Sequence, residues 1–231
     1  MDDAKAQTRQ QILEVAAEIL ERDGVQAVST RSVGAAAGIR AASLYQLFGD
    51  KDGLLTALAN HAFDLYLNEK HALVRTDDPV EDMRRGWDAH VDFGLNHPAL
   101  YLLMFGTDRP ERRPPAVARA HALLLAFIDR VAAAGRLRVP PARAAELSTA
   151  AATGVAMLLI GTPAEERDPE LSARMRDVLI DSLVTDVAPA AEPGLASSAL
   201  ALDAAIADEA DLPLRPAETA LLRDWLDRLA R

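Results

Sequence analysis

Residues 28–55 read VSTRSVGAAAGIRAASLYQLFGDKDGLL, and this stretch predicts a helix, a tight turn and a second short helix. Thr30 can cap the first helix, over about residues 31–37, because its hydroxyl can accept a hydrogen bond from the free N–H groups of the opening turn. Gly38 permits the sharp turn that follows. The second helix is expected over about residues 40–48, so the stretch has the outline of a helix-turn-helix.

The second predicted helix separates large side chains from small ones. Leu44, Leu47 and Phe48 recur at i, i+3 and i+4, so they share the face that we expect to lie inward. The outward face is left with Ala41, Ala42, Tyr45 and Gln46. Small side chains let a helix backbone approach a surface closely, and the major groove of DNA, about 12 Å wide, admits one helix. The outward face is therefore a candidate for reading DNA.

Polar and charged residues around this helix fit contacts with a duplex. Arg31 and Arg40 can donate to guanine or to phosphate, and Gln46 can pair with adenine. Lys51 begins the next predicted helix, where the helix dipole and the ammonium group would both hold a phosphate. The hydroxyl of Tyr45 can reach a phosphate as well. These residue types predict a DNA-contacting surface.

At these residues the sequence resembles the TetR family of bacterial regulators. The resemblance lies within about residues 8–55, in the pattern Thr30, Val33, Ala36, Ala37-Gly38-Ile39, Leu44-Tyr45, Phe48, Lys51 and Leu54. It implies contacts with phosphates and base edges from Thr30, Arg31, Ala41, Ala42, Tyr45 and Lys51. With Arg40, Ser43 and Gln46, these residues form our set of DNA-binding candidates. Arg40 stands where the family usually has a capping serine, and Leu47 where it usually has a histidine or a similar polar residue.

The whole chain is predicted to be all-α. Apolar residues recur at spacings of three and four, and the alternation typical of strands is almost absent. A helix over about residues 5–22 completes a three-helix head, and one over about residues 51–70 follows the head. Further helices are expected from Pro79 to about His97, from Pro98 to Phe105, from about Val117 to Gly135, and over about residues 142–160, 170–187, 195–210 and 216–230.

We predict three parts: a DNA-binding head (residues 1–50), a helical-bundle ligand-binding and dimerisation domain (51–188) and a helical extension (189–231). The middle part resembles a TetR-type C-terminal domain, especially in GWDAHVDFGLNHPALYLLMFG at residues 86–106. The resemblance implies a ligand pocket among the middle helices and a homodimer formed by the helices at 142–160 and 170–187. Small side chains offer a surface for close helix packing at Ala144, Ala145, Ser148, Ala151, Ala152 and Val155. The extension could cover the pocket, thicken the dimer or pack on the partner subunit.

A pocket for a small molecule has mostly apolar walls and a few polar groups. The ligand-binding candidates are Phe63, Tyr66, Trp87, His90, Val91, Tyr101, Met104, Phe105, His121 and Leu124. Trp87, His90 and His121 are the better candidates, because each would bring a polar atom inside. The alternative is a solid core in which the same side chains only pack. No histidine pair has the spacing and supporting carboxylate of a metal site, and no cofactor is expected.

Composition limits the remaining classes. The chain has no cysteine, which excludes disulfides and thiolate metal sites. No apolar run reaches the ~18 residues needed to span a bilayer, and the polar N-terminus is unlike a signal peptide, so we expect a cytoplasmic protein with no membrane partner. The net charge of −10 argues against nucleic acid, but residues 24–49 carry two arginines and no acid. Charge therefore permits DNA binding at the head.

These observations favour a ligand-responsive transcriptional repressor. It would bind a two-fold-symmetric operator in double-stranded DNA as a homodimer and be released by a small-molecule effector. The alternative is a helical small-molecule-binding protein whose head has lost DNA affinity, which the overall acidity, Arg40 and Leu47 favour. An enzyme is not expected, because no nucleophile–base pair, close carboxylate pair or metal motif emerges.

Overall fold

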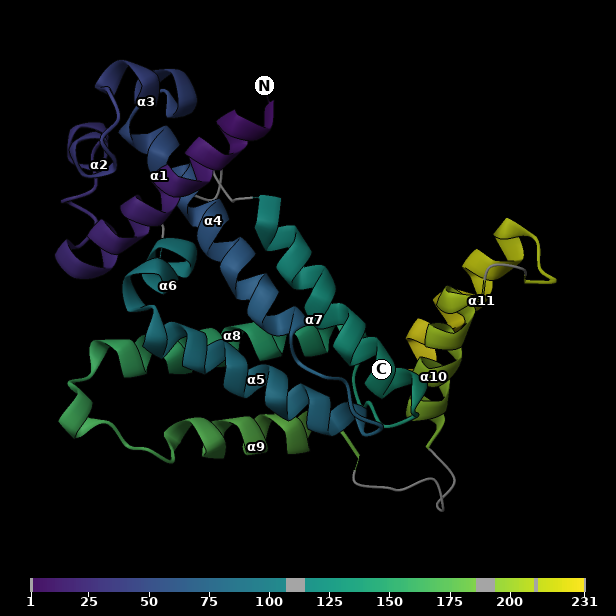
Figure 1. Cartoon of the computed structure of the whole chain (residues 1–231). Helices are drawn as coiled ribbons and strands as arrows, with labels where there is room; N and C mark the ends of the chain where they lie inside the picture. The colour runs from purple at the N-terminus through teal and green to yellow at the C-terminus, as the bar shows by residue number, and fades with distance from the viewer. Residues whose placement is uncertain (1, 107–114, 186–193, 210–211, 231) are drawn as a thin grey trace. The chain divides into compact units, whose positions relative to one another are not determined.

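Helices make up most of the chain that the computed structural model describes, which is residues 2–106, 115–185, 194–209 and 212–230 (Figure 1). The helices in these ranges are α1 (Asp2–Asp23), α2 (Thr30–Ala37), α3 (Ala41–Phe48), α4 (Lys51–His71), α5 (Pro79–Asn96), α6 (Pro98–Phe105), α7 (Pro115–Ala133), α8 (Pro141–Gly161), the 3-10 helix η2 (Ala164–Glu166), α9 (Leu171–Leu183), α10 (Leu195–Asp208) and α11 (Pro216–Leu229). The described ranges contain no strand, and their only β contact is an isolated antiparallel bridge between Leu137 and Val184. The predicted all-α fold is confirmed.

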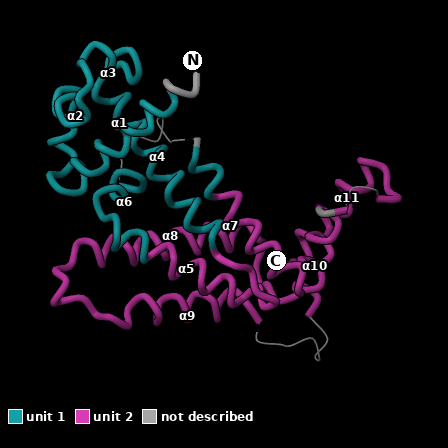
Figure 2. Tube along the Cα trace, viewed as in Figure 1, with its two compact units in different colours: residues 1–72, 92–120 teal, residues 73–91, 121–231 magenta. Residues whose placement is uncertain are grey.

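The chain divides into two compact units (Figure 2). The first unit consists of residues 1–72 and 92–120, and the second of residues 73–91 and 121–231. Both α5 and α7 therefore contribute residues to each unit. The domain limits that we predict at residues 50 and 188 stay predictions.

The first unit is built on apolar faces of α1, α4 and α6. Ile12 and Leu20 of α1, Leu58 of α4, and Leu100 and Tyr101 of α6 are all almost completely buried. α6 packs against both α1 and α4, and α1 also packs against α2. The helix-turn-helix thus packs against the two long helices α1 and α4, which also pack against α6.

The second unit has one hydrophobic core to which six helices contribute. Its buried residues include Val80 and Met83 of α5, Ile128 and Val131 of α7, Ala144 and Ala145 of α8, Ile180 and Leu183 of α9, Leu200 and Ile206 of α10, and Leu226 of α11. The two helices of the predicted C-terminal extension therefore pack into the same core as α5 and α7. The predicted linker at residues 189–193 lies outside the described residues.

The last helix before that linker ends earlier than the sequence indicates. The sequence predicts a helix to Val187, but α9 ends at Leu183. Its end is set by backbone pairing with a distant segment, because Arg138 N–H donates to Leu183 O (2.8 Å) and Thr185 N–H donates to Arg136 O (2.8 Å). The chain thus leaves the helix to form this short antiparallel contact.

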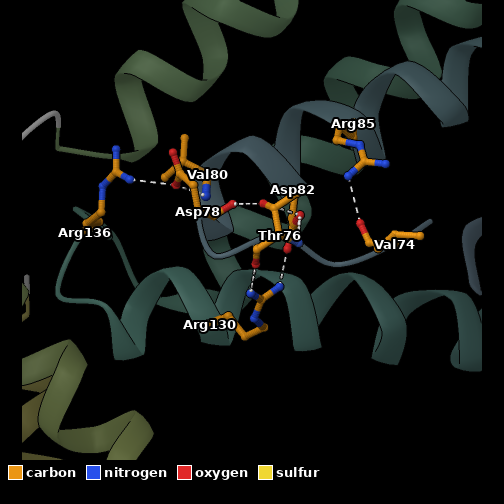
Figure 3. A network of polar contacts seen from close by, with 8 residues as sticks. All are labelled: Val74, Thr76, Asp78, Val80, Asp82, Arg85, Arg130 and Arg136. Carbon is orange, nitrogen blue, oxygen red and sulfur yellow. Dashed lines mark hydrogen bonds and ion pairs between the residues drawn. The ribbon is translucent and has the colours of Figure 1, made fainter.

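A buried carboxylate fixes the segment that precedes α5 (Figure 3). Asp82 is almost fully buried, and it accepts hydrogen bonds from Thr76 N–H (2.8 Å), from the Thr76 hydroxyl (2.9 Å) and from the Arg130 guanidinium. Arg130 also donates to Thr76 O (2.9 Å). Burial tends to raise the pKa of Asp82, but the hydrogen bonds from Arg130 and Thr76 outweigh it and leave the pKa below its usual value. The network ties the start of α5 to α7.

Among the described helices, α8 alone is long and apolar enough to cross a membrane by length and composition. The sequence lacks a continuous apolar run there, since Ser148, Thr149 and Thr153 interrupt it. A core helix of a globular protein passes the same test. In this protein Ala144 and Ala145 of α8 lie in the core of the second unit, which accounts for the apolar composition.

Candidate nucleic-acid interface

The first helix of the helix-turn-helix begins with a reciprocal serine cap. Ser29 is the N-cap of α2, and its hydroxyl accepts from Ser32 N–H (3.0 Å), while Ser29 N–H donates to the Ser32 hydroxyl (3.0 Å). Ser32 also donates to Ala27 O (2.6 Å). The prediction that Thr30 is the cap was wrong, since Thr30 is the first helical residue. Because Ser29 and Thr30 both carry a hydroxyl, the composition at this end could not separate them.

The turn after α2 depends on the glycine that the sequence indicates. Gly38 has φ +67° and ψ +26°, a left-handed conformation that residues with a Cβ rarely adopt. Its N–H donates to Gly34 O, which closes the end of α2. The turn leads directly into α3, so the two helices are joined by only three residues, 38–40.

α3 divides its faces as predicted. Leu44 and Phe48 are buried and Leu47 is half-buried. The Arg9 guanidinium of α1 lies 5.2 Å from the centre of the Phe48 ring, a cation–π contact that sequence spacing could not reveal. The side chains of the outward face are exposed at Ala41, Ala42, Tyr45 and Gln46. This face is available to a surface brought against α3.

Two arginines flank the exposed face without partners of their own. Arg31 and Arg40 are exposed, and neither side chain forms a hydrogen bond or ion pair in the part of the chain that the structure describes. Arg40 occupies the N-cap position of α3 in an extended conformation, and its side chain makes no capping bond. The first N–H groups of α3 therefore lack the side-chain cap that a serine would supply. Thr30 and Ser43 are half-buried beside this face.

Lys51 is the first residue of α4 and lies between two acids. Asp50 is the N-cap, and its carboxylate accepts from Gly53 N–H (2.8 Å). Asp52 follows in the first turn, and Lys51 itself is half-buried without a bonded partner among the described residues. Lys51 can thus reach toward a phosphate, but the neighbouring carboxylates reduce the local positive charge.

The predicted ligand-binding residues fall into both units. In the first unit, the Phe105 ring lies 5.5 Å from the Phe63 ring and 4.6 Å from the Tyr101 ring. Tyr66 packs edge-on against Phe93 at 5.3 Å, and burial raises its pKa well above the ordinary value. Met104 is also buried in this unit. These side chains form an aromatic cluster with α4 on one side and α6 on the other.

The ligand-binding candidates of the second unit differ in how they are placed. Trp87 is buried, and its indole N–H donates to the Ser172 hydroxyl (3.0 Å). His90 and Val91 are buried too, and Leu124 is half-buried. His121 was expected to bring a polar atom inside, but its side chain is exposed. Helical spacing places residue 121 on the face of Leu124, but this face is only half-buried at Leu124 and is exposed at His121.

Metal ligands do not gather anywhere in the described ranges. No group of three or more His, Asp or Glu side chains there is arranged so that it could hold a metal ion. The site that remains is the exposed face of α3 with the cationic residues around it.

Two family models match the chain, one on each side of residue 60. The model described as bacterial regulatory proteins, tetR family, matches residues 12–58. The model described as tetracyclin repressor-like, C-terminal domain, matches residues 83–183. The chain belongs to the TetR family. Its helix-turn-helix is the N-terminal region of a TetR-family transcriptional regulator, and the C-terminal model ends where α9 ends.

Solved structures support the same TetR fold. A protein of unknown function from Rhodococcus sp. RHA1 is 26% identical with a TM-score of 0.63, over 77% of this chain and 96% of that one. A TetR-family regulator from Haemophilus influenzae is 18% identical with a TM-score of 0.59, over 79% and 99% of the two chains. The fatty acid degradation regulator FadR from Bacillus halodurans is 14% identical with a TM-score of 0.64, over 74% and 94%. These proteins are matched over nearly their whole length, whereas about a fifth or more of this TetR-family chain lies outside each match.

Proposed function

We propose that this TetR-family protein is a ligand-responsive repressor that binds a two-fold-symmetric operator through α3. The observation that carries the proposal is the exposed face of α3, with Tyr45 and Gln46 outward. At its edge lie Arg31 and Arg40, whose side chains have no partner among the described residues. Its alanines leave room for the backbone to enter a major groove. Arginine is suited to guanine edges and to phosphates, so the same face supplies both positioning and readout.

Local charge supports binding in spite of the acidic chain. The net charge is −10, but the short segment from residue 24 to residue 49 contains only basic charges. Phosphate contacts depend on charges within about a Debye length, which is about 8 Å at physiological ionic strength. The arginines at the face therefore act at short range, while the acids elsewhere weaken long-range attraction. We expect moderate affinity that falls steeply with salt.

A homodimer is proposed through α8 and α9, along the edge of the small-residue face of α8 at which Ala151 is only half-buried. Of the predicted small residues, Ala144, Ala145, Ser148, Ala152 and Val155 are buried within the chain itself. Large apolar side chains are exposed instead on both helices, at Leu147, Leu158, Met175 and Val178. α8 and α9 pack against each other, so these side chains can form one apolar surface.

The second copy of the chain fits this surface because a two-fold operator requires paired heads. In a symmetric dimer the same residues face each other across the axis, and an apolar patch is complementary to itself. Each head then reads one half-site, with half-site centres about 34–36 Å apart or at a multiple of that spacing. The proposed dimer therefore accounts for the exposed apolar side chains and for operator symmetry.

Release by an effector is proposed to act through the helices that support the head. A small molecule that binds better to a conformation with wrongly spaced heads lowers DNA affinity, by no more than its difference in affinity for the two states. α4 is a suitable lever, because it begins at Lys51 beside the DNA face and carries Phe63 and Tyr66 of the aromatic cluster. We expect the protein to act in the cytoplasm without catalysing a reaction.

Fluorescence anisotropy with the duplex DNA of highest affinity selected from random fragments tests the proposal. Binding should be sequence-dependent, and the logarithm of the association constant should fall linearly with the logarithm of salt concentration. Failure to enrich any sequence, or binding that salt does not affect, would favour the alternative of a small-molecule-binding protein without DNA affinity. Sedimentation of the same complex should give two chains for each duplex.

A further inference from the structure

The N-terminus of α6 is capped by a side chain from the DNA-binding head. α6 begins after His97-Pro98, and the N-cap residue His97 provides no side-chain hydrogen bond. Glu21 of α1 takes that role from 78 residues away: Ala99 N–H donates to its Oε2 (3.1 Å) and Leu100 N–H to its Oε1 (3.0 Å). Both carboxylate oxygens are therefore engaged by the first turn of α6.

The neighbours of Glu21 leave its carboxylate directed at α6. Arg22, the adjacent cation, is turned to Asp23, with 2.7 Å between Nη2 and Oδ2. Glu21 is half-buried, so water competes less for its oxygens than at an exposed site. A carboxylate at a helix N-terminus gains from the helix dipole and from charge-assisted hydrogen bonds. The contact is thus a directional link between two helices.

α1 extends this link into the DNA-binding face. Its apolar side is buried from Ile12 to Leu20, so this part of the helix is held by packing along one continuous face. Toward its other end, the Arg9 guanidinium lies over the ring of Phe48 in α3. A displacement of α6 that pulls on Glu21 is therefore passed along α1 to the helix that we propose reads DNA.

We infer that Glu21 is a positioning residue that couples the placement of α6 to the DNA affinity of the head. The inference rests on the proposed function and adds a second route beside α4. An effector-driven shift of α6 would either break the hydrogen bonds from Ala99 and Leu100 to Glu21 or move α1 together with α6. By reciprocity, DNA bound at α3 must also stabilise the capped position of α6.

α6 keeps other supports when Glu21 is changed, so the coupling can be tested in a folded protein. The ring of His97 lies 5.0 Å from the Phe93 ring in a tilted arrangement, and its Nε2 lies 3.9 Å from Glu69 Oε1 of α4. The helix also packs against α4, where the Phe105 ring of α6 lies 5.5 Å from the Phe63 ring of α4. We expect variants at Glu21 to lose the coupling to α1 without losing α6.

Hydrogen exchange of the segment containing residues 97–106, with and without saturating duplex DNA selected from random fragments, measures the coupling even while the effector is unidentified. In the wild-type protein, DNA should slow exchange in this segment by about fivefold or more, the low end of typical coupling factors. Glu21→Asp keeps the charge but shortens the side chain, and Glu21→Gln keeps the length but removes the charge. Both should reduce the DNA-induced slowing to less than about twofold.

Glu18→Gln is the matched control, since Glu18 is an exposed glutamate one turn earlier on α1. It removes the same charge and should keep the wild-type slowing. A DNA-induced slowing in Glu21→Asp equal to that of the wild type, with DNA still bound, would overturn the inference alone. Failure of the wild-type protein to bind any duplex would overturn the proposed function and this inference with it.

Discussion

Gly34 of α2 lies so close to Leu44 of α3 that a Cβ at position 34 would stand 2.8 Å from Leu44 Cδ1. It would also stand 2.9 Å from the carbonyl oxygen of Ile39, which belongs to the backbone and cannot turn aside. The absence of a side chain at Gly34 is therefore what lets α2 and α3 approach each other. The angle between the two helices of the DNA-binding motif depends on this contact.

We predict that Gly34→Ala destabilises the head by about 1–3 kcal/mol, the usual cost of overpacking. Gly86→Ala is the matched control, because a Cβ at this helical glycine meets nothing within 4 Å. It should leave stability unchanged or raise it by up to about 1 kcal/mol, since alanine favours helices. Thermal unfolding followed by circular dichroism compares the two. Equal melting temperatures for both variants would contradict the close contact.

Asp82→Asn should lower the free energy of unfolding by about 1.5–3 kcal/mol, the usual worth of a hydrogen bond to a charged group, because Arg130 would lose its carboxylate partner. The lowered pKa of Asp82 also predicts a pH dependence. A carboxylate with a lowered folded pKa stabilises fully above its unfolded pKa, about 3.9, and loses that contribution as pH falls through the folded value. Denaturation at pH 7 and at pH 3 measures both effects.

The difference in stability between wild type and Asp82→Asn should therefore shrink in acid. Asp224→Asn is the control, since Asp224 is exposed on α11 and has no bonded partner among the described residues. It should change little at either pH. A difference for Asp82→Asn that stays constant from pH 7 to pH 3 would show that the charge of Asp82 is not involved.

Lys51→Ala and Tyr45→Phe should weaken binding to all DNA sequences about equally, because both residues are proposed to contact phosphates. Loss of the Lys51 contact should also reduce the slope of log K against log salt by about 1. Arg143→Ala removes an exposed cation of α8, outside the first unit, and should alter neither quantity. Anisotropy titrations at several salt concentrations measure both the affinity and its salt slope for each variant. An unchanged salt slope for Lys51→Ala would remove this residue from the interface.

Val178→Glu should dissociate the proposed dimer, because it would bury a carboxylate in an apolar contact. Val178 is 67% exposed in the single chain, so the variant should still fold as a monomer. Val74→Glu places the same charge at a residue that is 74% exposed outside α8 and α9, and this variant should remain dimeric. Sedimentation velocity across a concentration series distinguishes the two. A Val178→Glu protein that stays dimeric at low concentration would place the interface elsewhere.

Leu226→Ala should destabilise the second unit by about 2–5 kcal/mol, since Leu226 of α11 is buried in the core shared with α5 and α7. Leu229 is a suitable comparison because it lies on the same helix but is 46% exposed. Its replacement by alanine should cost less than about 1 kcal/mol. Chemical denaturation measures both. Equal effects would mean that the extension contributes little to the core of the second unit.

Local patterns in the sequence were sufficient for the helices and for the faces of α3. Periodicity places Leu44 and Phe48 inward and Tyr45 outward, and the structure agrees. The left-handed turn at Gly38 follows from a local conformational preference. These features depend on residues within one or two helical turns, so a single sequence contains enough information for them.

Features that depend on distant residues could not be predicted in this way. In the sequence alone Glu21 looks like any glutamate on a helix surface, because its partners on α6 are 78 residues away. α9 ends early because Arg138 pairs with Leu183 and Arg136 with Thr185. The small face of α8 has the composition of a dimer interface, but it packs within its own chain. The exposure of His121 likewise depends on how far other helices cover α7.

The hydrogen bond from the Trp87 indole to Ser172 makes Trp87 an intrinsic fluorescent probe of the contact between α5 and α9. The chain has two tryptophans, and the other, Trp225, is about half exposed on α11. Trp225→Phe would therefore leave one buried fluorophore, held by a hydrogen bond between α5 and α9. Any compound that separates these helices or enters beside them would change the emission of Trp87, so a compound library can be screened for the effector without a label and before the operator is identified.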